Sequence, residues 1–165
     1  QDTVDAKLVA TVEAMLRGFE YVPTKAEWTQ LGPDAAVVLR RIAADPKALA
    51  THRGRAVSAL AYFDHPDNLT ALSTLLGDTK TPEHVKRKAL LAAAMAYGDR
   101  AVPVIKPFAA AQSRDVRESA IQALGRINTP SARTVLEARL KLEPKAQLRD
   151  IIRVNLNPKQ QPGNR

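Results

Sequence analysis

The sequence contains no cysteine, few aromatic residues (4%) and no long apolar run. Without cysteine, disulfides, zinc-thiolate sites and thiol nucleophiles are excluded for these 165 residues. No segment approaches the roughly 20 consecutive apolar residues that a membrane-spanning helix needs, and no Gly-rich phosphate loop or nucleophile elbow occurs. His52, His65 and His84 lack the spacing of a helical metal-binding pair. We therefore predict no metal, no cofactor and no catalytic residue, and we expect that the protein is not an enzyme.

Apolar residues instead follow helical spacing, and no segment shows the alternation of a strand. A first amphipathic helix is predicted from about Asp2 to Glu20, capped by Asp2 or Thr3 and with Asp5 in its first turn. Its apolar stripe consists of Val4, Leu8, Val12, Met15 and Phe19. We expect this helix to cover the N-terminal end of the core.

Thr24 and Glu27 have the spacing of a capping box, in which each side chain accepts from the backbone amide of the other residue. A short helix should follow, carrying Trp28. We interpret this tryptophan as a core residue and not as a ligand-stacking side chain.

The rest of the chain reads as helices separated by Pro- and Gly-containing turns. These helices are predicted over residues 33–45, 51–63, 69–76, 81–95, 101–110, 115–127, 132–142 and 146–156. Pro103 fits the helix over 101–110 only if it lies in the first turn. Residues 157–165 are predicted to be a flexible tail.

The helices repeat with a period of about 32 residues, which indicates a stack of helical hairpins. The same core position is occupied by Ala56, Ala89, Ala120 and Ile152. A second column contains Leu60, Ala93, Leu124 and Leu156, and a third contains Leu39, Leu72, Ile105 and Leu136.

The segment VRESAIQALGRINTPSARTVL, residues 116–136, resembles a HEAT-like repeat of the bacterial type found in phycobilisome lyase subunits. The match lies at Val116-Arg117, Ala120, Ala123-Leu124-Gly125 and Pro130, whereas Ala61 and Ala94 replace the glycine in other units. The resemblance implies an all-α fold, a right-handed α-solenoid of about four HEAT-like hairpins. We expect a single domain over residues 1–156, with a capping helix at 2–22 and repeats from about 24 to 156.

One column of the register is basic: Arg53, Lys86, Arg117 and Arg149 each lie near the start of a second helix. In HEAT-like repeats, such an arginine commonly bonds an acidic group of a neighbouring loop. Asp45, Asp78 and Glu143 are the expected partners. This ladder between repeats is the favoured interpretation, and a row of ligand-binding cations is the alternative.

The positive charge is uneven, because residues 79–165 carry 17 Lys/Arg against 7 Asp/Glu, whereas residues 1–78 carry 8 against 10. With Arg55, Arg87 and Lys88, the basic column predicts a positive concave face that binds a protein partner with an acidic surface. The hypothesis is a non-catalytic interaction module or adaptor. The alternatives are a nucleic-acid-binding protein that resembles the HEAT-like alkylpurine DNA glycosylases and a non-catalytic subunit of an enzyme complex.

The chain begins at Gln1 without methionine. The N-terminus is therefore expected to be either processed or artificially shortened. A removed secretory signal favours a periplasmic or secreted location, with a cytoplasmic location as the alternative.

Overall fold

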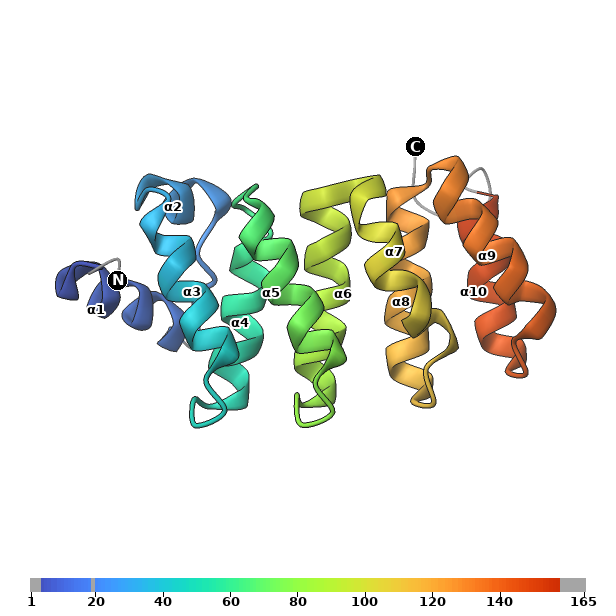
Figure 1. Cartoon of the computed structure of the whole chain (residues 1–165), viewed down its shortest axis with the longest axis horizontal. Coiled ribbons are helices and arrows are strands. Elements are labelled where there is room, and N and C mark those ends of the chain that lie inside the picture. The colour runs from blue at the N-terminus through green and yellow to red at the C-terminus, as the bar shows by residue number, and fades with distance from the viewer. Residues whose placement is uncertain (1–3, 19, 158–165) are drawn as a thin grey trace. The chain divides into compact units, whose positions relative to one another are not determined.

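The structure, a computed structural model, describes residues 4–18 and 20–157, and every regular element in them is a helix (Figure 1). No strand occurs in these residues, which confirms the all-α fold class. The chain packs as two compact units, residues 1–92 and residues 93–165. The handedness of the solenoid and its treatment as one domain stay predictions.

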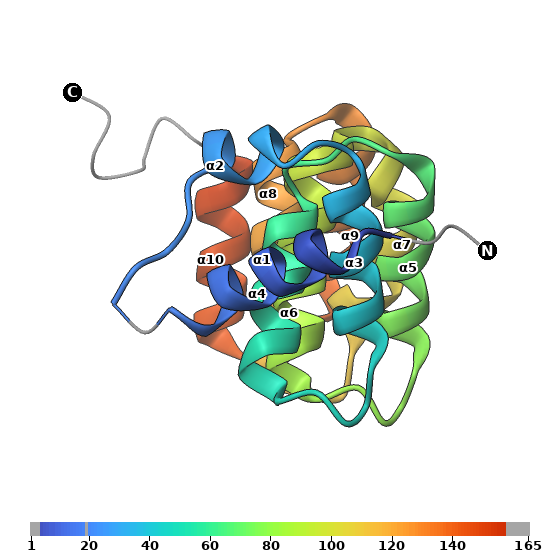
Figure 2. The same ribbon diagram turned by 90° about the vertical axis from the view of Figure 1, so that its left-hand side faces the viewer.

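In its described residues, the first unit contains five helices and the start of a sixth. They are α1 (Ala6–Arg17), α2 (Lys25–Gln30), α3 (Asp34–Ala44), α4 (Ala50–Leu60), α5 (Pro66–Gly77) and α6 (Glu83–Tyr97), which continues into the second unit. α3 packs along α4, and α1 contacts both of them. Figure 2 shows α1 lying across α3 and α4.

The capping box is confirmed, because the Thr24 side chain accepts from the Glu27 amide and the Glu27 carboxylate accepts from the Thr24 amide at 2.7 Å. The start of α1 differs from the prediction. Asp5 is its N-cap and accepts from the Lys7 amide at 3.0 Å, so Asp5 precedes the first turn and does not lie within it. The expected caps at Asp2 and Thr3 lie outside the described residues.

Among its described residues, the second unit contains the end of α6, an irregular segment and then three regular helices. Its elements are η1 (Gly98–Ala101), α7 (Val102–Ile105), η2 (Lys106–Ala110), α8 (Arg114–Ile127), α9 (Pro130–Leu142) and α10 (Ala146–Leu156). α8 packs against both α9 and α10. Of the predicted tail, only Asn157 is described, as the C-cap of α10.

The helix predicted over residues 101–110 is wrong in its continuity, because a one-turn α-helix there is flanked by 3₁₀ segments. Pro103 lies in the first turn of α7, as its fixed φ and missing amide require. Pro107 removes another amide and would clash with the preceding turn, so α7 ends at Ile105 and the chain continues as 3₁₀ helix. The prediction took account of one proline and not of the other.

The predicted register is confirmed by burial. Ala56, Ala89, Ala120 and Ile152 are all fully buried, as are Leu39, Leu72 and Ile105 of the third column. Trp28 is 3% exposed, which confirms its place in the core. The sequence pattern therefore identifies the side chains that hold each unit together.

Gly125 marks a close approach between α8 and α10. A Cβ atom at Gly125 would lie 2.8 Å from the Asn155 Cβ and closer still to the Asn155 amide group. Real Cβ atoms do not approach so closely, and only glycine fits this position without displacement of α10. The close packing of α8 against α10 therefore explains why the repeat motif has glycine at position 125.

Candidate functional site

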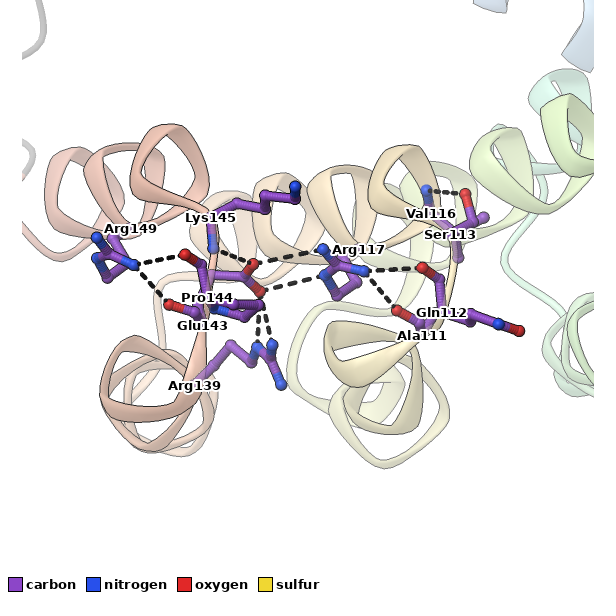
Figure 3. A network of polar contacts seen from close by, with 10 residues as sticks. All are labelled: Ala111, Gln112, Ser113, Val116, Arg117, Arg139, Glu143, Pro144, Lys145 and Arg149. Atoms are coloured by element: carbon purple, nitrogen blue, oxygen red, sulfur yellow. Dashed lines mark hydrogen bonds and ion pairs between the residues drawn. The ribbon is translucent and has the colours of Figure 1, made fainter.

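The basic column was the sequence-based candidate, and in the second unit its arginines bond to the protein itself (Figure 3). Arg117 is 8% exposed and donates from Nη1 to the carbonyl oxygens of Ala111 and Gln112, both at 2.9 Å. Its Nε and Nη2 donate to the Glu143 carboxylate at 3.2 and 3.4 Å. One guanidinium thus joins the turn before α8 to the turn before α10.

Arg149 makes the same contact with its own turn. Its Nη1 donates to the carbonyl oxygens of Glu143 and Pro144, both at 2.9 Å. These acceptors lie six and five residues before Arg149, as Ala111 and Gln112 do before Arg117. The repeated spacing gives the two arginines an equivalent structural role.

The Glu143 carboxylate is the centre of this network, and its side chain is fully buried. Burial alone disfavours its charge. The amide of Lys145 and the guanidinium groups of Arg139 and Arg117 outweigh that effect and hold the pKa of Glu143 below its ordinary value of 4.5. Arg139 approaches to 2.7 Å, so the buried carboxylate has two arginine partners. Such charge-assisted bonds fix the orientation of the elements they join.

The predicted ladder between repeats is confirmed for the pair Arg117 and Glu143. It is wrong for Asp45 and Asp78, which were also expected to bond a basic residue of the column. Arg53, which is 5% exposed, donates from Nε to the Ala43 carbonyl at 2.9 Å, and no bond joins it to Asp45 in the described residues. Asp45 and Asp78 each accept at 2.8 Å from the amide two residues later, in their own turns. Both carboxylates stabilise local loop structure.

Arg55 also bonds to backbone, across the first unit. Its Nη1 donates to the carbonyl oxygens of Leu16 at 2.7 Å and Gly18 at 2.6 Å. The last carbonyls of a helix have no partner within it, so Arg55 supplies a partner to the end of α1. Of the predicted site residues, Arg53, Arg55, Arg117 and Arg149 all bond to main-chain oxygens.

The remaining predicted site residues lie together on α6. Lys86 is half-buried, and Arg87 and Lys88 are exposed. Arg87 already interacts with another residue, whereas neither Lys86 nor Lys88 has a side-chain hydrogen bond or ion pair within the described part of the chain. These two lysines are available to a partner.

On α8 and α10, acidic neighbours offset several of the exposed cations. Arg114 lies 3.0 Å from carboxylate oxygens of Asp115 and Glu118. Arg153 lies 2.7 Å from Asp150. Ion pairs within α8 and α10 therefore leave less positive charge available to a partner than the sequence predicts.

A cleft beside Lys88 was not predicted. It encloses about 230 Å³ in the first unit, between the segment that follows α1 and the helices α4 and α6. Its lining consists of Met15, Leu16, Tyr21, Val22, Pro23, Trp28, Arg55, Ser58, Ala59, Tyr62 and Lys88. The only tryptophan and two of the three tyrosines of the chain are among them. Only Tyr21 and Trp28 are near one another in the sequence, so no local pattern indicated the cleft.

Within the described residues, no group of three or more His, Asp or Glu side chains could hold a metal ion. No helix among them has the length and apolar character to cross a membrane.

Among known families, the model for HEAT repeats matches residues 81–157. No curated protein matches the chain. The matched residues include α8, α9 and α10, together with the Arg117 and Glu143 network.

Proposed function

We propose, from the premise that this chain is a HEAT-like repeat protein, that it is a non-catalytic interaction module that binds a protein partner through α6. HEAT repeats commonly mediate contacts between proteins, because stacked hairpins expose long rows of side chains on a rigid framework. The narrower relation to phycobilisome lyase subunits stays a prediction.

The observation that carries this proposal is the state of Lys86 and Lys88. They stand two residues apart on α6 and therefore point about 200° apart around its axis, so each adds separately to the positive potential of this helix. No described residue neutralises either of them. The arginines of the basic column are used in bonds to the main chain, so their substitution would change the fold as well as the surface. The lysines therefore favour a partner with an acidic surface.

A capture experiment tests the proposal with the full chain, tagged at one end. Lys86→Glu/Lys88→Glu is compared with wild type and with the matched control Lys7→Glu/Lys47→Glu, which reverses two exposed lysines of the same unit. Arg87 is left unchanged because its side chain already interacts. Proteins retained by wild type are identified by quantitative mass spectrometry after nuclease treatment.

We expect at least one protein that wild type and the control retain and the α6 variant loses. With that protein purified, the double reversal should weaken Kd at least ten-fold, and the circular dichroism of the variant should match wild type. Equal binding by the α6 variant would exclude this surface. Retention that disappears on nuclease treatment, together with a steep salt dependence on duplex DNA, would replace the protein partner with nucleic acid.

A further inference from the structure

We infer that the aromatic cleft of the first unit is an anchor site for an acidic peptide segment, which inserts one bulky apolar side chain. The inference rests on the proposed function, since it specifies the chemistry of the partner. Three features lead to it: the size of the cleft, its lining and the charges at its edge.

The size indicates a single side chain. Sites for small molecules usually enclose about 300–1,000 Å³, whereas this cleft encloses about 230 Å³. Pockets that receive one anchor residue of a partner protein are smaller, and such anchors contribute most of the binding energy of an interface. The cleft therefore fits one phenylalanine or leucine better than an independent ligand.

The lining favours an apolar or aromatic anchor. Trp28 and Tyr62 contribute ring surfaces, and Met15 adds a flexible apolar side chain that adapts to the shape of its neighbour. Tyr21 is 54% exposed and Val22 is 79% exposed. An inserted side chain would cover apolar surface that now faces water.

The charges at the cleft select acidic flanking residues. Among the described residues, Arg55 and Lys88 are the only charged side chains that line the cleft, and both are cations. The Glu27 carboxylate nearby already accepts from Tyr21 and Thr24. Since none of the described carboxylates lines the cleft, an anion is attracted there without competition from the described lining.

The two cations of the lining differ in what they already bind. Arg55 and Lys88 occupy equivalent positions one repeat apart, and α4 contacts α6, since the Lys88 Cγ would lie 3.9 Å from a Cβ at Gly54. Arg55 already donates to the carbonyl oxygens of Leu16 and Gly18, so Lys88 is the cation available to a carboxylate. An extended peptide advances about 3.3 Å per residue, so a glutamate within about two residues of the anchor can reach Lys88 from either side. The sequence Glu-Phe-Ser-Glu satisfies this condition.

The experiment uses the tryptophan of the cleft as its reporter. The full chain is titrated with acetyl-Gly-Glu-Phe-Ser-Glu-Gly-amide, which contains no tryptophan, and the emission of Trp28 is followed. Because Trp28 is the only tryptophan of the chain and lines the cleft, we expect a saturable change with a Kd on the order of 0.1–1 mM. Peptides with Ala in place of Phe, or Lys in place of both Glu residues, should bind at least ten-fold more weakly.

Two variants of the protein complete the test. Lys88→Glu should weaken binding about ten-fold, whereas the control Lys47→Glu should leave it unchanged. Ser58→Leu adds apolar volume to the lining and should abolish the fluorescence response while circular dichroism stays as in wild type.

The outcomes separate the anchor site from the wider proposal. No binding of the Phe peptide to wild type, by fluorescence and by calorimetry, would overturn the anchor site, even where partner capture through Lys86 and Lys88 succeeds. A change in Trp28 emission on raising the protein concentration alone, with dimers in sedimentation, would assign the cleft to a second copy of the chain and would also overturn it. Peptide binding without partner capture would support the site and contradict the wider proposal.

Discussion

Replacement of Gly125 by alanine should destabilise the second unit, although the same change stabilises most helices. Alanine is favoured over glycine inside a helix by about 1 kcal/mol. At this position, however, the new methyl group would lie 2.8 Å from the Asn155 Cβ and would overlap the amide group of that side chain. Overpacking in a closely packed contact costs about 1–3 kcal/mol. We expect a net loss of up to about 2 kcal/mol in the free energy of unfolding.

Urea denaturation followed by circular dichroism at 222 nm measures this loss. The matched controls are Gly54→Ala and Gly77→Ala. A Cβ at Gly54 would meet only ordinary contacts, 3.5 Å and beyond, and nothing lies within 4 Å of one at Gly77. Both controls should therefore be neutral or stabilising. In an Asn155→Ala background the Gly125 substitution should cost less, so a double-mutant cycle should give a coupling of about 1 kcal/mol. Stabilisation by Gly125→Ala equal to that of the controls would refute the close approach of α8 and α10.

The remaining predictions concern polar contacts. Glu143→Ala leaves the buried Arg117 without its carboxylate partner and should cost about 3–5 kcal/mol in chemical denaturation, whereas the exposed Glu137→Ala should cost little. The pKa of Glu143 in the folded protein lies below its ordinary value of 4.5. The stabilisation that its charge gives is therefore complete above pH 4.5 and is lost as the pH falls through the folded pKa. The difference between wild type and Glu143→Ala should thus shrink on acidification, and a constant difference down to pH 3 would contradict the role of the charge. Thr24→Ala removes a capping contact and should cost about 1 kcal/mol, whereas Thr24→Ser should restore most of it, in denaturation followed by Trp28 fluorescence.

Local signals in the sequence predicted local structure well. The capping box at Thr24 depends on residues three apart, and the buried column through Ala56, Ala89 and Ala120 depends only on helical period and repeat length. Both features are present in the folded protein because no contact with a distant segment overrides these local preferences. The broken helix around Pro107 was also a local signal, since the ring of proline interrupts a helix wherever it stands.

Contacts between segments far apart in the chain were not predictable in this way. Arg55 meets the Leu16 carbonyl across 39 residues, and that contact exists because α1 happens to end beside α4. The glycine at position 125 matched a family pattern, but its cause lies in Asn155 on another helix. The cleft likewise forms where residues from α1, α2, α4 and α6 meet. A single sequence shows which residues are present but not which distant residues meet in the folded protein.

Equivalent core positions of the repeat are buried in every unit, whereas equivalent surface positions differ in residue type and in bonding partners. Packing from several sides restricts a core position to small or apolar residues, whereas a position at the surface responds only to what covers it. Arg55 is covered by the end of α1 and bonds to its carbonyls, while Lys88, one repeat later, has no such partner in the described residues. The same position then becomes Ser119 and Ile151. A row of cations in an alignment of repeats is therefore not by itself a binding surface. A cation is available to a partner only where the fold leaves it unbonded, which is why binding is assigned to Lys88 and structure to Arg117.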